Sequence, residues 1–315
     1  MRKYKKIYKL SPSLHANIWG GNKLRDYGKE SSDDRIGESW ELSFVKGAEA
    51  TVDGGYGTTE IFDKDAWGKN CRGFEDFPVL TKFIDAREKL SVQVHPSDEY
   101  ALKNEGMYGK SEMWYVVSAE EGAGLYMGLQ RECSPEEFSK KVADGTVEEL
   151  LSFKTVKAGD VFFIPAGTIH AIGAGVLIYE IQQNSTLTYR LYDYMRRDKN
   201  GNLRELHVEK AMKVSKLVPY SSESYEDDEI IGKCKYFITK KYDFDGIIRF
   251  FEVKEDSYLM LTVVSGNGFI HYQDFNGERF DIEINAGDSY FLPAGAGAFT
   301  AEGYMTLITV ETPEE

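Results

Sequence analysis

The sequence predicts a mostly β protein that contains two copies of one β-barrel domain, with a short helical insertion in the first copy. Three observations support this fold class. Short segments rich in Val, Ile, Phe and Tyr are separated by Gly, Pro and Asp, which is typical of strands joined by turns. A nine-residue motif occurs twice in the chain. One capped helical stretch interrupts the strand pattern of the first copy.

The first copy carries most of the strand-like segments. They are residues 77–84, 89–95, 113–118, 160–165 and 176–182. Their short length and regular spacing favour a sandwich or a barrel.

The internal repeat is the strongest organisational signal. Gly159–Gly167 reads GDVFFIPAG and Gly287–Gly295 reads GDSYFLPAG, so that six of nine positions are identical. Upstream of each, Val116-Val117-Ser118 recurs as Val263-Val264-Ser265 in the same order. Two ordered matches predict two structurally related domains.

The predicted helical insertion covers residues 134–152. Ser134-Pro135-Glu136-Glu137 supplies an N-cap, a proline at the first helical position and a glutamate at the third. A second helix is expected over residues 205–214, and the Ser- and acid-rich residues 220–229 indicate a linker. We therefore expect a first domain over residues 1–225 and a second over residues 226–315.

The formal net charge of −14 disfavours nucleic acid and anionic membranes as partners, because the long-range field repels both. A small anionic substrate is compatible with this charge if Lys and Arg gather in a local site. The three cysteines form no CxxC pair, which predicts free thiols and a cytoplasmic protein. No apolar stretch follows the basic N-terminus, and no apolar run reaches transmembrane length.

The repeat also provides an internal control for functional residues. Glu112 lies four residues before Val116, and the same count before Val263 reaches Leu259. His170 lies three residues after Gly167, and the same count after Gly295 reaches Ala298. A structural role shared by both copies would not predict this difference, so we expect a site in the first copy that the second has lost.

Two more candidate ligands precede Glu112. Gln93 and His95 are two residues apart on a predicted strand and therefore project from the same face. With Glu112 and His170 they give two imidazoles, a carboxylate and an amide oxygen, a set that suits Zn²⁺ with a position left open. A set of two histidines and one carboxylate also suits non-haem Fe²⁺. The other histidines, His15, His207 and His271, are expected to be structural.

These motifs resemble a known family. Gly159, Pro165, Gly167 and His170 have the spacing of the second cupin motif, and the segment with Gln93, His95 and Glu112 resembles a variant of the first. The setting Leu90–Pro96 resembles the type I mannose-6-phosphate isomerases, as do Lys110–Tyr115, Leu187–Leu191, Phe77–Lys82 and Ile18–Gly21. The resemblance implies a bicupin of two jelly-roll barrels and one Zn²⁺ per chain. Two features depart from the family: Ile18 replaces an acidic residue, and residues 134–152 replace a larger helical insertion.

The resemblance also implies an activity, the interconversion of mannose 6-phosphate and fructose 6-phosphate through an enediol. Arg190 lies where the family has its active-site arginine. A regular strand from Glu180 would place both side chains on one face, whereas a bulge or turn near Asn184-Ser185 would break this alternation. Lys110 and Lys82, with Ser91, are candidates for contacts with the phosphate or the sugar. Glu180, Glu38 or a metal-bound water could act as the base. Trp19 is expected to line the pocket.

Two other functions fit the same ligand set. One is a non-haem iron cupin dioxygenase, and the other is a non-catalytic sugar-binding cupin. Gln93 in place of the usual histidine argues against the first, and the intact ligand set argues against the second. The sequence does not specify an oligomeric state.

Overall fold

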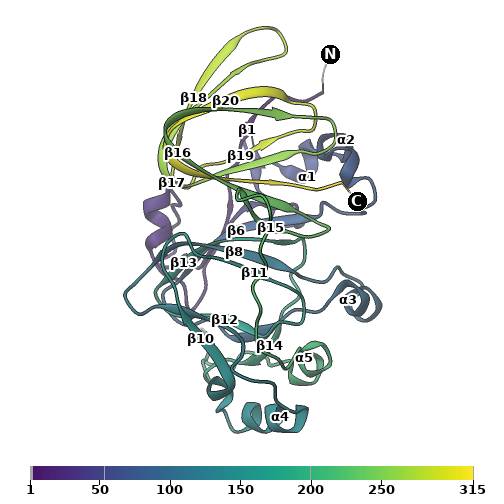
Figure 1. Ribbon diagram of the computed structural model, residues 1–315, viewed down its shortest axis with the longest axis vertical. Coiled ribbons are helices and arrows are strands. Elements are labelled where there is room, and N and C mark those ends of the chain that lie inside the picture. Colours follow the sequence, from purple (N-terminus) through teal and green to yellow (C-terminus); the bar gives the residue numbers. More distant parts are fainter. Residues whose placement is uncertain (1–2, 53, 199, 315) are drawn as a thin grey trace.

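The computed structural model describes residues 3–52, 54–198 and 200–314. The protein is mostly β, as predicted. Its sheets form two stacked bodies, with the C-terminal strands in the upper half of Figure 1 and the helices α4 and α5 at the lower end. Both ends of the chain lie in the upper body (Figure 1).

The lower body, called the first barrel below, consists of two sheets. The six-stranded sheet has the order β11-β8-β13-β6-β3-β2 and the five-stranded sheet has the order β10-β9-β12-β7-β14. The six-stranded sheet contains β2 (Ser13–His15), β3 (Glu38–Leu42), β6 (Val79–Ala86), β8 (Glu112–Ala119), β11 (Val161–Ile164) and β13 (Val176–Gln183). The five-stranded sheet contains β7 (Val92–Val94), β9 (Gly124–Leu129), β10 (Leu151–Thr155), β12 (His170–Ile172) and β14 (Tyr189–Tyr192).

The upper body, called the second barrel below, is built on one seven-stranded sheet. Its path is β1-β19-β17-β20-β16-β15, and β18 pairs with β17 beside it. These strands are β1 (Tyr8–Lys9), β15 (Ile230–Lys233), β16 (Ile238–Val253), β17 (Leu259–Gln273), β18 (Arg279–Asn285), β19 (Ser289–Leu292) and β20 (Gly297–Glu311). The N-terminal strand β1 pairs with β19 in antiparallel register, so this sheet is not drawn from residues 226–315 alone.

The predicted insertion forms a helix and a 3₁₀ turn. Helix α4 (Pro135–Ala143) begins where predicted, because Ser134 Oγ accepts a hydrogen bond from the Glu137 amide at 3.2 Å. Phe138 and Val142 are buried on one face, and the 3₁₀ helix η3 (Val147–Leu150) follows before β10 begins. Helix α5 (Val208–Val214) begins three residues later than expected, and the amide of its N-cap residue His207 donates to the Arg190 carbonyl at 2.8 Å.

The remaining elements are short. They are η1 (Lys23–Tyr27), β4 (Thr51–Val52), β5 (Tyr56–Gly57), α1 (Thr58–Ile61), α2 (Lys64–Trp67), η2 (Lys69–Cys71) and α3 (Asp98–Asn104). Within the described residues, no helix is long and apolar enough to cross a membrane. Cys71, Cys133 and Cys234 are free thiols, as predicted.

The two copies of the repeat fold in the same way. The Val116 amide donates to Asp160 O at 2.9 Å, and the Val263 amide donates to Asp288 O at 3.0 Å. Each Val-Val-Ser motif forms a β-bulge, where the register shifts between Val116 and Ser118 in β8 and between Val263 and Ser265 in β17. Both copies of the repeat therefore specify a bulged strand and the turn that packs beside it.

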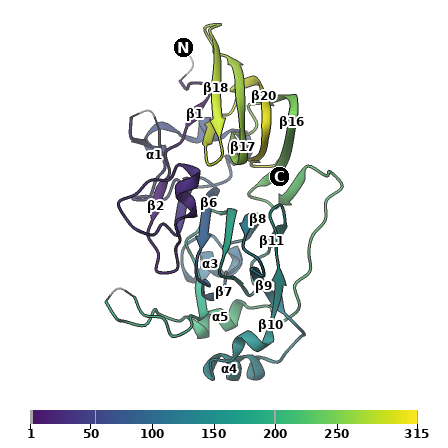
Figure 2. The same ribbon diagram turned by 90° about the vertical axis from the view of Figure 1, so that its left-hand side faces the viewer.

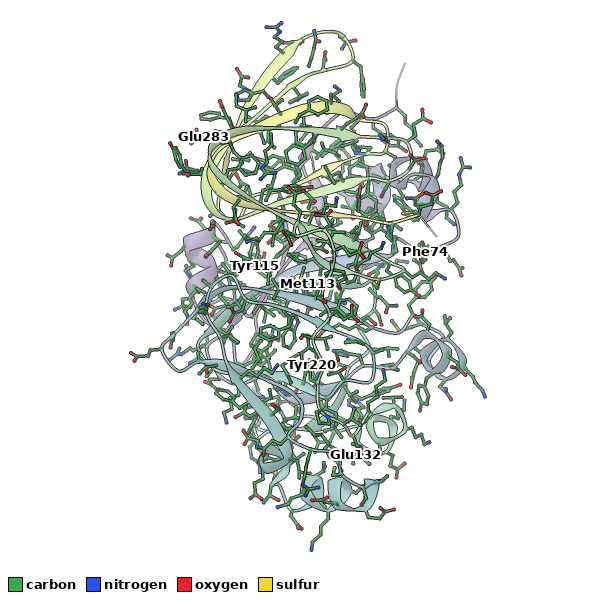
Figure 3. All side chains as sticks on the ribbon, in the orientation of Figure 1. Phe74, Met113, Tyr115, Glu132, Tyr220 and Glu283 are labelled. Carbon is green, nitrogen blue, oxygen red and sulfur yellow. The ribbon has the colours of Figure 1, made fainter. Side chains whose placement is uncertain are left out.

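The middle strands of the six-stranded sheet, β6 and β13, are buried on both faces. Phe83, Met113 and Tyr179 belong to a core shared with second-barrel residues such as Met260 and Phe291. Their chain neighbours Ile84, Trp114 and Ile178 instead pack inside the first barrel, because side chains alternate along a strand. Figure 3 shows Met113 and Tyr115 between the two bodies, and Figure 2 shows the same stacking from the side.

Polar contacts add to this interface. Tyr179 Oη lies 2.8 Å from Thr262 Oγ1 of β17, and both side chains are buried. Buried Lys29, which follows η1, donates to Gly287 O at 2.7 Å and pairs with Glu41 at 2.9 Å. The second barrel is therefore fixed to the back of the sheet that carries the candidate site.

Candidate metal centre and substrate cavity

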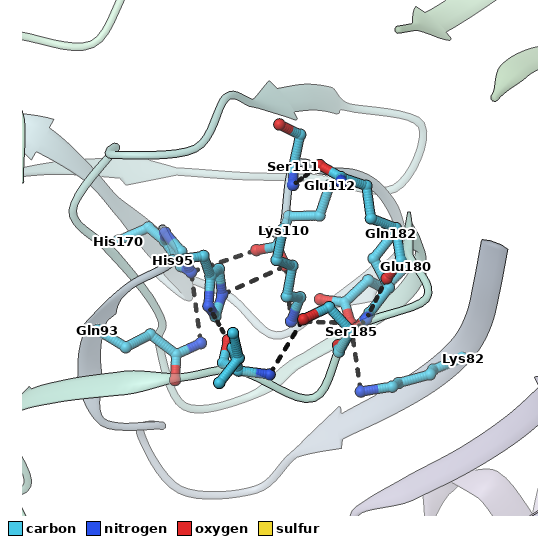
Figure 4. A network of polar contacts seen from close by, with 12 residues as sticks. Lys82, Gln93, His95, Lys110, Ser111, Glu112, His170, Glu180, Gln182 and Ser185 are labelled. Atoms are coloured by element: carbon cyan, nitrogen blue, oxygen red, sulfur yellow. Dashed lines mark hydrogen bonds and ion pairs between the residues drawn. The ribbon is translucent and has the colours of Figure 1, made fainter. Parts of the chain in front are cut away.

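Three buried side chains inside the first barrel form a cluster with the chemistry of a metal site. His95 Nε2 lies 3.5 Å from Glu112 Oε2, and His170 Nε2 lies 3.2 Å from Glu112 Oε1. One ligand atom from each residue lies within 4.8 Å of the others. His95 directly follows β7, Glu112 begins β8 and His170 begins β12, so antiparallel pairing of separate chain segments builds the cluster (Figure 4).

Backbone carbonyls orient both imidazole rings. His95 Nδ1 lies 2.8 Å from Leu187 O, and His170 Nδ1 lies 2.9 Å from Thr168 O. A carbonyl can only accept, so Nδ1 carries the proton in each ring and the Nε2 lone pair faces Glu112. This is the arrangement that metal-binding histidines use.

The electrostatics favour neutral imidazoles. Burial lowers the pKa of His170 to about 4, and burial together with the charge of Lys110 lowers the pKa of His95 well below its usual value. His95 Nε2 and Glu112 Oε1 are buried without a hydrogen-bond partner among the described residues. Buried polar atoms normally have a hydrogen-bond partner. The free lone pairs of these two atoms are therefore suited to bind a cation.

Gln93 reaches the cluster with its amide nitrogen foremost. Its Nε2 lies 3.3 Å from His170 Nε2, and its Oε1 lies 3.4 Å from the hydroxyl of Ser91. An amide nitrogen does not bind metals, so a ligand role for Gln93 requires the amide to turn by 180°.

A network of alternating charges lies beside the cluster on the six-stranded sheet (Figure 4). Lys110 Nζ lies 2.9 Å from Glu112 Oε2 and 3.8 Å from Glu180 Oε1. Lys82 Nζ lies 3.6 Å from Glu180 Oε1 and 3.4 Å from Glu38 Oε2. Trp114 Nε1 holds the other oxygen of Glu180 at 2.8 Å. The two lysines therefore bridge three carboxylates.

This network shifts the pKa values of its members in different directions. Burial raises the pKa of Glu180, although Lys110 opposes the shift. Burial disfavours the charge on Lys110, but Glu112 and Glu180 outweigh burial and raise its pKa. For Glu38 burial is outweighed by Lys82 and the Trp40 hydrogen bond, and its pKa is lowered. Carboxyl groups with pKa values driven apart are typical of acid–base sites.

A cavity of about 120 Å³ opens onto this network. Eight of the eleven predicted site residues line it: Trp19, Glu38, Lys82, Ser91, Gln93, Lys110, Glu180 and Arg190. The other three, His95, Glu112 and His170, lie behind it and contact it through Gln93 and Lys110. Cavities of about 380 and 970 Å³ against the second barrel are larger, but they hold none of the predicted residues.

Of the two arrangements considered for the segment from Glu180 to Arg190, the structure has the one with a break near Asn184-Ser185. Arg190 does not share a continuous strand with Glu180, because β13 ends at Gln183 and β14 begins at Tyr189 in the other sheet. Between them the Ser185 amide donates to Gln183 O at 2.7 Å, and Gln182 Nε2 donates to Ser185 O at 2.7 Å, which turns the chain. Asn184 Nδ2 donates to Phe77 O at 2.8 Å and ties this turn to the start of β6. Arg190 and Glu180 therefore reach the same cavity from opposite sheets.

The residue that counting from the repeat assigns as the second-barrel counterpart of His170 is wrong. Ala298 is exposed on β20, whereas the next residue, Phe299, packs inside the second barrel. Equal counting from the repeat fails here: Gly297, with a positive φ of 81°, lies just before this position, and the inward-facing residue is Phe299. Neither Ala298 nor Phe299 can bind a metal, so the second barrel still lacks an equivalent of His170.

Sequence reasoning missed Trp40, Thr188 and Arg204. Trp40 Nε1 donates to Glu38 Oε2 at 2.6 Å, and its ring lies 4.7 Å from Lys82 Nζ. Two-residue spacing from Glu38 would have found Trp40. Thr188 and Arg204 line the cavity. Arg204 lies in a long loop without periodicity, so no local signal indicated it.

Two related barrels, of which only the first has a buried His/His/Glu cluster among the residues that the structure describes, define a bicupin with a candidate metal centre. Residues 7–122 match the family profile for the catalytic domain of type I phosphomannose isomerase. Residues 229–312 match the profile for the mannose-6-phosphate isomerase cupin domain. The chain belongs to the type I phosphomannose isomerase family.

Individual relatives cover nearly the whole chain. Mannose-6-phosphate isomerase ManA of Bacillus subtilis is 36% identical over 312 residues, 95% of this chain and 96% of that protein. The mannose-6-phosphate isomerase of Streptococcus mutans is 34% identical over 317 residues, 97% of this chain and 98% of that protein. The crystal structure of the Bacillus subtilis mannose 6-phosphate isomerase matches with a TM-score of 0.86 and 33% identity, over 97% of this chain and 99% of that one.

Proposed function

We propose that this chain is a zinc-dependent aldose–ketose isomerase that interconverts mannose 6-phosphate and fructose 6-phosphate through an enediol. The observation that carries the proposal is the pair of neutral, oriented imidazoles facing Glu112 beside the Lys110–Glu180 network. Family membership supports the substrate, and the donor set supports the metal.

His95, Glu112 and His170 would hold one Zn²⁺, and Gln93 would complete the set after its amide turns. Bound there, the ion supplies Lewis acidity that stabilises negative charge on a sugar oxygen. The second barrel has Leu259 in place of Glu112 and is not expected to bind a metal.

Glu180 is the base that the geometry favours. Its Oε1 is buried and makes no hydrogen bond with a described residue, while Trp114 fixes its other oxygen. Because burial raises its pKa, the carboxylate accepts a proton more readily than an exposed glutamate does. We infer that Glu180 takes the proton from one sugar carbon and returns it to the neighbouring carbon.

The remaining residues would bind and orient the sugar. Lys110 donates towards the oxygen on which charge develops, and Arg190 orients the sugar from the opposite sheet. Ser91, Lys82 and Glu38 offer hydrogen bonds to hydroxyl groups. Trp19 closes one side of the cavity. We propose that residues 1–225 form the catalytic domain and residues 226–315 the second domain, and that the protein works in the cytoplasm, where its free thiols stay reduced.

A coupled assay that detects fructose 6-phosphate formed from mannose 6-phosphate tests the function. We expect turnover that is lost after chelation and regained with Zn²⁺. The dioxygenase alternative would instead show oxygen consumption that depends on Fe²⁺. Absence of isomerisation in zinc-loaded, folded protein would overturn the proposal, and metal-independent turnover would overturn the role of zinc.

A further inference from the structure

The cavity contains more cations than its carboxylates neutralise, and the excess lies on one side. Lys82 and Lys110 are already bridged by three carboxylates of the six-stranded sheet. On the opposite wall Arg190 forms no ion pair with a described residue, and its Nε is buried without a hydrogen-bond partner. The unneutralised positive charge of the cavity is therefore on the arginine side.

Arg204 lines the same cavity as Arg190, although it lies in the loop between β14 and α5 (Figure 1). The two guanidinium groups affect each other, because burial and then the charge of Arg204 lower the pKa of Arg190. Asp193 and Glu205 act against this effect, but the two like charges still repel each other, and an anion bound beside both would relieve the repulsion.

A buried carboxylate holds Arg204 in place. Asp193 is 4% exposed, and its two oxygens accept hydrogen bonds from Arg204 Nε at 2.6 Å and Nη2 at 2.5 Å. Arg196 binds the same carboxylate, so that two arginines share one negative charge and the group keeps a net positive charge. Arg196 itself is held away from the cavity, because it donates to Lys89 O and lies over the Tyr194 ring.

The turn that follows Asp193 is strained. Tyr194 and Met195 have positive φ angles of 56° and 55°, which side-chain-bearing residues rarely adopt. Strain of this kind persists when surrounding contacts fix it, and it concentrates at functional sites. Here the Asp193–Arg196 and Arg196–Lys89 contacts close the turn and leave Arg204 facing the cavity.

We propose that Arg204 is a specificity-determining residue that recognises the phosphate dianion of the substrate, and that Asp193 is the positioning residue that holds it beside Arg190. This inference rests on the proposed function for the identity of the substrate. The charge pattern supports it independently: a phosphate monoester carries close to two negative charges at pH 7, which matches a cavity wall with excess arginine. A planar guanidinium also gives paired hydrogen bonds to phosphate oxygens.

Kinetics and inorganic phosphate together test the proposal. In Arg204→Ala we expect the KM for mannose 6-phosphate to rise about 10- to 100-fold, the loss expected for one charge-assisted contact, with kcat changed by less than about 3-fold. The inhibition constant of inorganic phosphate should rise by a similar factor. Asp193→Asn should change both constants in the same direction, and Arg204→Lys should recover part of the loss.

Two further variants make the test specific. Arg197→Ala is a matched control on the same loop, because Arg197 is exposed and donates to Gly201 O outside the cavity; it should leave both constants unchanged. In the double variant Asp193→Asn, Arg204→Ala, KM should be no higher than in Arg204→Ala alone, since Asp193 acts through Arg204. Circular dichroism and metal content check that each variant is folded.

An unchanged phosphate inhibition constant in folded Arg204→Ala would overturn the role of Arg204. Additive effects in the double variant would overturn the role of Asp193. Calorimetric titration with inorganic phosphate measures the same difference without turnover. If the wild type binds phosphate through Arg204 but does not isomerise the sugar, the proposed function fails while the anion site stands.

Discussion

Glu112 in the first barrel and Leu259 in the second occupy equivalent positions. Each residue pairs across an antiparallel ladder with the residue five positions after the first glycine of the repeat, Ile164 for Glu112 and Leu292 for Leu259. Both side chains point into their barrels, whereas the next residues, Met113 and Met260, pack in the core between the barrels. The same fold position thus carries a candidate metal ligand in one copy and an apolar side chain in the other.

This equivalence predicts the effect of exchanging the two residue types. Glu112→Leu should remove the metal and lower activity by more than about 100-fold, because loss of a ligand costs more than loss of an outer contact. The metal-to-protein ratio after dialysis measures the first effect. Glu112→Gln keeps the size of the side chain but removes the charge that pairs with Lys110, so it shows whether loss of this ion pair alone impairs folding. A variant that keeps stoichiometric metal would contradict the assigned ligand.

Replacement of Glu180 should reduce the rate of the chemical step without affecting metal binding. Glu180→Gln keeps a group that can accept from Trp114 but cannot take up a proton, so kcat should fall about 10²- to 10⁴-fold. The metal content should stay at the wild-type level. Glu38→Gln is the control variant. Because the pKa of Glu38 is lowered rather than raised, its replacement should reduce kcat much less than Glu180→Gln does. Equal losses in both variants would leave Glu180 without a special role.

His170 should make the metal-free protein sensitive to acid. Because burial lowers its pKa from about 6.5 to about 4, the unfolded chain binds this proton more readily than the folded chain. Stability should therefore fall as pH drops from about 6.5 towards 4, by up to about 3 kcal/mol from this group. Denaturant titration of chelated protein across this range gives the slope, which His170→Gln should reduce.

The control for this prediction has the opposite sign. Hydrogen bonds from His271 to Asp281 raise its pKa, so His271 adds stability at low pH that is lost as pH rises. This contribution is complete below about pH 6.5, so His271→Gln should leave the slope between pH 6.5 and 4 nearly unchanged and should alter the pH dependence of stability only above that range. A reduced slope in both variants would mean that neither histidine controls the transition.

The contact between Tyr179 and Thr262 should contribute to coupling between the barrels. Tyr179→Phe removes a buried hydrogen bond at 2.8 Å, and the free energy of unfolding should fall by about 1 kcal/mol. A double-mutant cycle with Thr262→Val isolates the pairwise energy, since Thr262 also contacts Ser289. Additive losses would show that the hydroxyl groups do not stabilise each other.

Much of the fold followed from the sequence because local and long-range signals agreed. The repeat predicted two related barrels, and the structure gives each Val-Val-Ser motif the same bulge. The capping residues placed the start of α4 at Pro135. Two separate signals led to the candidate metal cluster: strand spacing indicated His95, and the internal comparison indicated Glu112 and His170.

What the sequence could not give depends on where separate segments meet. The alternation of side chains from Glu180 to Arg190 is interrupted, because the chain leaves one sheet at Gln183 and enters the other at Tyr189. Arg204 and Asp193 become neighbours only through a turn with two positive φ angles. The pairing of β1 with the second barrel joins residues almost 300 positions apart, which no local pattern encodes.

The sheet between the two barrels has a consequence for motion. Every residue of β6 and of β13 is buried, and these strands carry Lys82 and Glu180. Regions with such dense packing open only when the whole protein unfolds. Amide hydrogens in these two strands should thus exchange most slowly, and those of the loop around Tyr194 much faster. Glu180, the proposed base, would then lie on the most tightly packed part of the molecule, whereas Arg204 lies in a loop that is held mainly by polar contacts with Asp193.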